Sequence, residues 1–180
     1  MSLKTSLNHT TVESNSKRKR SLEYEIRKAC FNGNIELAIK YLDAFDVLNI
    51  NELNQTKVLL YAVKSDVILV KRFLEIGCNV NVTNEMNQTP LHLASENGHY
   101  QIVELLLDYD AEIDKADVFQ QTALHLAAKE GCMMIVQKLL KNGAKIDLLD
   151  SIGRPALYMA ICSDKLQVAE LLLKHGAKHD

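Results

Sequence analysis

The sequence has little proline or glycine, no long apolar run and almost no net charge. Its two prolines and seven glycines suit short, repeated turns better than long loops. No apolar stretch approaches the roughly 18–20 residues that a membrane-spanning helix needs, so we expect no membrane association. The formal net charge is −2, and so weak a field attracts neither nucleic acid nor an anionic membrane. Residues 1–20 lack the apolar stretch of a secretory signal peptide.

Motifs of catalysis and metal binding are also missing. The sequence contains no phosphate-binding loop, no GxSxG or HExxH motif and no convergent pair of carboxylates. Its cysteines form no CxxC pair and no zinc-like grouping with histidine; they are Cys30, Cys78, Cys132 and Cys162. We therefore expect reduced thiols, no metal, no cofactor and no enzymatic activity.

What the sequence does contain is a repeat with a period of 33 residues. Thr56, Thr89 and Thr122 are separated by this interval, and Pro155 takes the next position in the series. A polar, turn-like stretch precedes each of these residues. An apolar octad follows each one and predicts a short helix.

A second helix is predicted later in each unit. Its apolar residues recur at i, i+1, i+4 and i+5, as in residues 102–107, and this spacing places them on one stripe. Gly77, Gly143 and Gly176 then stand where helices often end in a left-handed residue, and Asp110 takes this position in one unit.

Two stretches give the repeat a recognisable form. Residues 89–94 read TPLHLA and residues 122–127 read TALHLA, and ENGH and IVELLL follow the first of them. The chain therefore resembles the ankyrin-repeat family, well over residues 51–180 and loosely over 22–50. The resemblance implies an all-α solenoid of five stacked helix-turn-helix units joined by β-hairpin-like turns. We expect the units 22–50, 51–83, 84–116, 117–149 and 150–180, after a disordered basic tail at residues 1–21.

Units of this kind have to stack. One helix pair buries too little surface to offset the conformational entropy lost on folding. Its apolar stripe stays exposed to water until a neighbouring pair covers it. The first unit has Arg27 and Lys28 where the third has His92 and Leu93, a polarity typical of an N-terminal cap. The second unit departs furthest from the family pattern and has Tyr61 in place of alanine.

His92 and His125 occupy equivalent positions in neighbouring units. One interpretation of this pair is a metal site or an acid–base pair. The family resemblance implies another, in which each imidazole forms a hydrogen bond with the backbone of the adjoining turn. We favour this structural role, because buried polar groups are normally satisfied in such a way.

The turns carry an apolar column. Leu53, Met86, Phe119 and Ile152 recur at 33-residue intervals where turns normally carry polar residues. They predict either an exposed ridge that binds a protein or side chains that pack from tip to tip. In the family's architecture these turns and the first helices line a concave, partner-binding face. Further candidate contacts on that face are Glu85, Glu96, Asn97, Val118, Lys129, Glu130, Ser151 and Arg154.

These features lead to two functional hypotheses. The first is a protein-interaction module: a scaffold, adaptor or inhibitor that binds a partner protein and is itself a monomer. The alternative is a targeting or substrate-recruiting arm of a larger enzyme or effector whose catalytic part lies beyond residue 180. Nucleic-acid binding is disfavoured, because the sequence has no basic stripe outside residues 17–20.

That short basic run consists of Lys17, Arg18, Lys19 and Arg20. It fits a nuclear import signal, but a solvated, disordered arm is the commoner explanation of such a run, and both interpretations stay open. We expect a cytoplasmic protein, which becomes nuclear if the run directs import.

Overall fold

The computed structural model describes residues 21–46, 58–64 and 66–178, and every regular element in these ranges is a helix. The predicted all-α architecture is therefore confirmed. Residues 21–31 form one helix, followed by α2 (Ile35–Asp46), α4 (Val58–Ala62), α5 (Val67–Glu75), α6 (Pro90–Glu96), α7 (Tyr100–Asp108), α8 (Ala123–Glu130), α9 (Met133–Lys141), α10 (Ala156–Cys162) and α11 (Leu166–Lys174). None of the helices within the described ranges is long and apolar enough to cross a membrane.

Some expectations fall on other parts of the chain. The basic run at residues 17–20, Leu53 and the first expected turn all lie outside the described residues. Ser21, the last residue of the expected tail, is already helical.

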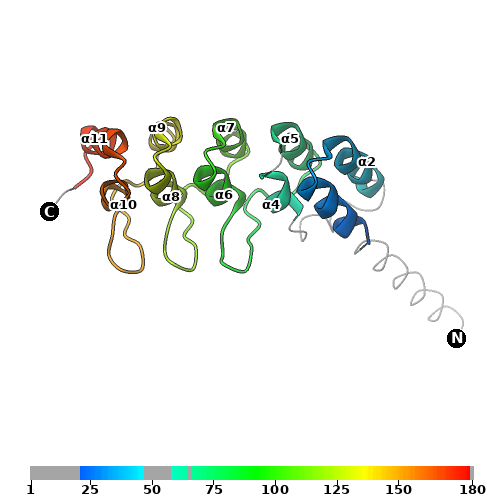
Figure 1. The fold of residues 1–180 in the computed structure, drawn as a ribbon, viewed down its shortest axis with the longest axis horizontal. Coiled ribbons are helices and arrows are strands. Elements are labelled where there is room, and N and C mark those ends of the chain that lie inside the picture. Colours follow the sequence, from blue (N-terminus) through cyan, green and yellow to red (C-terminus); the bar gives the residue numbers. More distant parts are fainter. Residues whose placement is uncertain (1–20, 47–57, 65, 179–180) are drawn as a thin grey trace, which may run out of the picture.

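The helices form two rows (Figure 1). The first helices α4, α6, α8 and α10 lie in one row, and the second helices α5, α7, α9 and α11 lie in the other. Hairpin-like turns project from the first row, before α6, α8 and α10. In the turn before α8, the amide of Asp117 donates to the carbonyl of Gln121 over 2.9 Å, and the other two turns repeat this bond.

The second helices end where the sequence predicts, at residues with positive φ: Gly77, Asp110, Gly143 and Gly176. A left-handed residue folds the chain back, so that the next amide reaches a carbonyl within the last helical turn. After α9, for example, the amide of Ala144 donates to the carbonyl of Leu139 over 3.1 Å. Each second helix is thereby closed, and the chain is directed toward the following turn.

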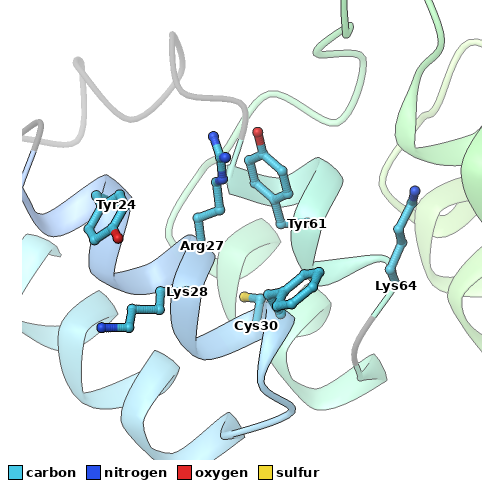
Figure 2. Close-up of a pocket in the computed structure, with 7 residues that line it drawn as sticks. Tyr24, Arg27, Lys28, Cys30, Tyr61 and Lys64 are labelled. Carbon is cyan, nitrogen blue, oxygen red and sulfur yellow. The ribbon is translucent and has the colours of Figure 1, made fainter.

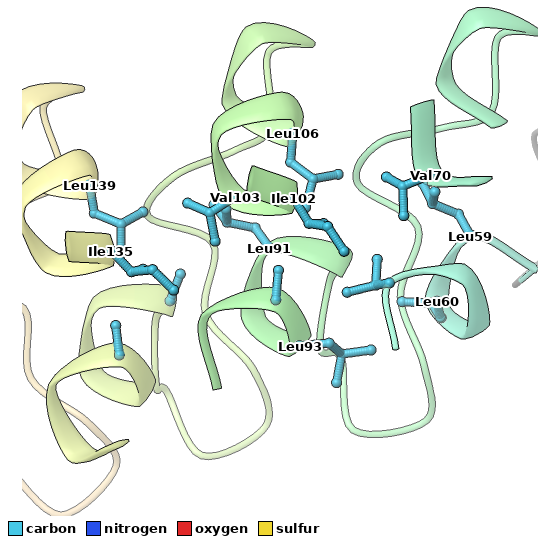
Figure 3. Packing of buried hydrophobic residues seen from close by; sticks show 14 of the residues in the cluster. Leu59, Leu60, Val70, Leu91, Leu93, Ile102, Val103, Leu106, Ile135 and Leu139 are labelled. Carbon is cyan, nitrogen blue, oxygen red and sulfur yellow. The ribbon is translucent and has the colours of Figure 1, made fainter. Parts of the chain in front are cut away.

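The apolar stripes of neighbouring units merge into one core (Figure 3). Leu106, Leu139 and Leu172 are equivalent in three second helices, and each is 0% exposed. The first helices carry alanine at an equivalent buried position, as at Ala94 and Ala127. Small side chains at this position leave room for the next helix, and α8 packs against both α6 and α10.

A ladder of hydrogen bonds holds consecutive units in register. A side-chain Oδ1 accepts the backbone amide of the next unit at Asn81 from Glu112 (2.9 Å), at Asp114 from Lys145 (3.0 Å) and at Asp147 from Lys178 (3.0 Å). The same bond therefore recurs in step with the 33-residue period.

We expect that truncating a side chain in the shared core strongly destabilises the protein. Leu106→Ala should lower the free energy of unfolding by about 2–5 kcal/mol, because Leu106 is fully enclosed between units. Leu166→Ala is the matched control, since Leu166 is 61% exposed, and it should change stability by no more than about 0.5 kcal/mol. Urea unfolding of both variants measures the difference, and equal effects would contradict the stacked core.

Candidate partner-binding site

The hairpin-like turns before α8 and α10 are each anchored by a histidine from the preceding unit. The backbone amide of Thr89 donates to Nδ1 of His92 over 3.1 Å, so Nδ1 is an acceptor and Nε2 carries the hydrogen. Nε2 lies 3.0 Å from the carbonyl oxygen of Gln121, in the next turn, and donates to it. The predicted bond between imidazole and adjoining backbone is confirmed.

His125 repeats this arrangement one unit later. Its Nδ1 accepts from the amide of Thr122 over 3.2 Å, and its Nε2 donates to the carbonyl of Arg154 over 3.1 Å. His92 and His125 are each 1% exposed, and burial lowers the pKa of both although the hydrogen bond to a carbonyl opposes that shift. Since both ring nitrogens are engaged, these imidazoles link repeats and do not serve as metal ligands.

In the turns before α8 and α10, a carboxylate at the base fixes the shape of the turn. Oδ1 of Asp117 accepts from the amides of Phe119 (2.8 Å) and Gln121 (2.9 Å). Oδ1 of Asp150 accepts in the same way from Ile152 (3.1 Å) and Arg154 (2.9 Å). The amide of each tip residue is therefore satisfied inside its own turn.

The two carboxylates differ at their second oxygen. Oδ2 of Asp150 accepts from Nε and Nη2 of Arg154 over 2.9 and 2.7 Å. Burial by itself raises the pKa of Asp150, but the bonds from Arg154 and from the turn amides outweigh burial and hold this pKa at about 2. Gln121 stands in the place of Arg154 in the preceding unit, and within the described residues Oδ2 of Asp117 is buried without a hydrogen-bond partner.

Adjacent turns are joined through their backbones. The amide of Val118 donates to the carbonyl of Met86 over 3.0 Å, and the amide of Ser151 donates to the carbonyl of Phe119 over 2.8 Å. These bonds set the tips in a row along one edge of the stack, as Figure 1 shows. The tip backbone is thus held in place independently of the tip side chains.

The tip side chains remain accessible. Met86 is 43% exposed, Phe119 49% and Ile152 70%, and Val118 beside them is 53% exposed. We call these four residues the tip row. Within the described residues, the predicted apolar column is therefore partly exposed, and backbone hydrogen bonds join the adjacent turns.

The other predicted contacts surround the tip row or lie on the first helices. Glu85 and Ser151 are exposed at the tips. On α8, Lys129 and Glu130 pair with each other over 3.6 Å, with about half of each side chain accessible. Arg154 is partly engaged, because its guanidinium binds Asp150.

The equivalent positions of α6 are Glu96 and Asn97. Glu96 is half-buried at the last residue of the helix, and Asn97 is exposed just after it. The side-chain amide of Asn97 donates to the carbonyl of Leu93 over 2.7 Å and so caps the end of α6.

The structure also reveals a cavity of about 500 Å³ that was not predicted from the sequence. It lies at the N-terminal end of the first-helix face, between the helix of residues 21–31 and α4. Its lining includes Tyr24, Arg27, Lys28, Phe31, Tyr61 and Lys64. The one hint in the sequence was Tyr61, which stands at a first-helix position that is alanine in the later units.

The cysteines differ in their exposure. None of the four forms a disulfide within the described residues, and Cys30 and Cys78 are buried. Burial raises the pKa of Cys78 to about 12, so its thiol stays protonated at neutral pH. Cys162 is exposed at the end of α10.

Stacked helix pairs joined by hairpin-like turns, with an exposed row of side chains along the turns, define a repeat solenoid with an extended binding surface. A family model described as ankyrin repeats, in three copies, matches residues 26–117 and 113–180. The chain therefore belongs to the ankyrin-repeat family. Members of this family are generally protein–protein interaction modules and typically not enzymes. A search of curated proteins found no match.

We predict that acid destabilises the protein through its two buried histidines. Because burial lowers the pKa of His92 and His125, the unfolded chain binds protons below about pH 6.5 that the folded chain does not. The free energy of unfolding should be highest above pH 6.5 and fall as the pH drops from 6.5 toward the folded-state pKa values. Urea unfolding at several pH values tests this. His125→Gln should show a shallower dependence, and stability that rises on acidification would contradict the prediction.

We also predict that the unpaired oxygen of Asp117 limits stability. Gln121→Arg should reproduce the Arg154–Asp150 pair and raise the free energy of unfolding by about 1 kcal/mol. Arg154→Gln, the reverse exchange one unit later, should lower it by a similar amount. Gln121→Lys is the control, because its ammonium cannot make the two-pronged contact. Thermal unfolding of the three variants compares their stabilities. If Gln121→Arg is no more stable than the wild-type chain, the prediction is wrong.

Proposed function

We propose that this protein is a scaffold, adaptor or inhibitory subunit that binds a partner protein on the face formed by its hairpin tips and first helices. The observation that carries this proposal is the tip row of Met86, Val118, Phe119 and Ile152. These side chains are apolar, adjacent and 43–70% exposed. A contiguous row of such residues is characteristic of an interface, whereas single exposed apolar residues are ordinary on any surface.

The backbone geometry supports the same proposal. Turn amides are satisfied by Asp117 and Asp150, and neighbouring tips are bonded to each other, so the row is ordered before a partner arrives. A partner would then lose little conformational entropy in ordering this surface. Glu85 beside the tip row and the Lys129–Glu130 pair at the end of α8 add polar groups to the proposed face, and interfaces commonly combine an apolar core with a polar rim.

The described surface supports recognition better than catalysis. The two buried histidines are committed to hydrogen bonds between repeats, and within the described residues no group of three or more metal-ligating side chains comes together. The function supported best is therefore recognition, in which the protein acts by occupying a surface of its partner.

We predict that Phe119 is the anchor of this interface. Phe119→Ala should weaken partner affinity by about 2 kcal/mol or more, because a central aromatic side chain is lost from the contact. The melting temperature should hardly change, since half of the side chain is exposed and the backbone bonds at this position remain. A partner captured with the wild-type chain as bait is purified, and its affinity for both chains is measured by calorimetry.

Tyr109→Ala provides the matched control. Tyr109 is 37% exposed but follows the second helix α7, away from the tips, so its removal should leave affinity intact. If Phe119→Ala lowers the melting temperature strongly while affinity per folded molecule is unchanged, the ring packs between turns and the proposed interface is wrong.

A further inference from the structure

The cavity at the N-terminal end of the first-helix face combines cations with aromatic rings. Figure 2 shows the side chains that line it, which come from the helix of residues 21–31 and from α4 with the residues that follow it. A volume of about 500 Å³ is within the usual range for a ligand site and holds a few side chains of a bound segment.

The charged side chains that line this cavity, within the described part of the chain, are all cationic. Arg27, Lys28 and Lys64 line it, whereas Glu23 and Glu25 of the same first helix do not. Among the side chains that the structure describes, no carboxylate lies within ion-pair distance of these three cations. The site is therefore complementary to negative charge that a ligand would bring.

Arg27 is already oriented for such a ligand. Its guanidinium carbon lies 5.2 Å from the centre of the Tyr61 ring, within the range of a cation–π contact. Stacking uses the flat face of the guanidinium and leaves the N–H groups at its edge able to bind a carboxylate with two parallel hydrogen bonds. The contact depends on Tyr61 standing where later units have alanine.

The same cavity presents apolar surface to water. Phe31 is 91% exposed and Tyr24 is 59% exposed. Phe31 stands at the first-helix position that Glu96 occupies in the third unit, so a phenyl ring replaces a charged side chain on the predicted binding face. Covering a ring that is so fully exposed to water with apolar ligand surface favours binding.

We infer that this cavity binds a short acidic segment of a partner protein that carries one large apolar side chain. Carboxylates of the segment pair with Arg27, Lys28 and Lys64, and the apolar side chain packs against Phe31 and Tyr24. The inference rests on the proposed role as a protein-binding module, but it uses residues distinct from the tip row.

A nucleic acid fits this surface less well. A long polyanion needs cations along its whole path, whereas the first-helix face beyond the cavity carries Glu96 and Glu130. Lys129 on that face is paired with Glu130 over 3.6 Å, so a local acidic motif suits the cavity better than a long polyanion does. Single-stranded nucleic acid therefore enters the experiment as a competing outcome.

A fluorescent synthetic peptide with glutamates on both sides of one phenylalanine tests the inference by polarisation against the intact chain. We expect saturable binding that Arg27→Gln and Phe31→Ala each weaken about tenfold, since a charge-assisted contact or an apolar contact is lost. Lys141→Gln is the matched control: Lys141 is an exposed lysine at the end of the second helix α9, and its loss should leave affinity unchanged.

The peptide series and two other chains separate the outcomes. The peptide with alanine in place of phenylalanine should bind more weakly, and the peptide with lysine in place of glutamate should not bind. Phe119→Ala should keep peptide affinity even where it loses the natural partner, so a failure of the tip row and a failure of this cavity are distinguishable. Absent binding, equal affinity for the lysine peptide or for a single-stranded oligonucleotide, or an unchanged Arg27→Gln would each overturn the inference.

Discussion

Every helix pair in this protein carries one apolar stripe that only the neighbouring pair can remove from water. Leu106, Leu139 and Leu172 are fully buried because each is covered in this way. The hydrogen bonds from His92 to the next turn and from the next unit's amides to Asp114 then set the angle and register of the stack. Neither kind of bond would form if the apolar faces were not already in contact. Burial of the stripe therefore supplies the stability, and the polar bonds supply the geometry.

The same division explains why the turns can bind. Their backbone groups are satisfied within the turn and by adjacent turns, so the side chains of Met86, Phe119 and Ile152 have no structural task that requires burial. A turn of this kind tolerates an apolar residue at its tip without losing its shape. The recognition surface can therefore vary while the solenoid beneath it stays constant.

The irregular units contribute something different from the regular units. Units that match the repeat pattern closely supply the buried leucines, and they supply the histidines that bond each unit to the next. The first two units replace small or polar repeat residues with Tyr61 and Phe31, and there the structure opens a cationic cavity. Departures from the pattern thus mark the place where the molecule differs chemically from a generic stack of repeats, which is where specificity is expected to reside.

The 33-residue period by itself determined the helix pairs, the turns, the left-handed helix ends and the buried columns. It could do so because equivalent residues in a one-dimensional stack meet equivalent neighbours, so local pattern and tertiary environment coincide. Only the tertiary structure decided that Asp150 is paired while Asp117 is not, and that Arg27 and Tyr61 meet over one cavity. The first fact depends on Arg154 reaching back to Asp150 within its own turn, and the second on Arg27 and Tyr61 meeting across two units. A periodic pattern carries no information about such contacts.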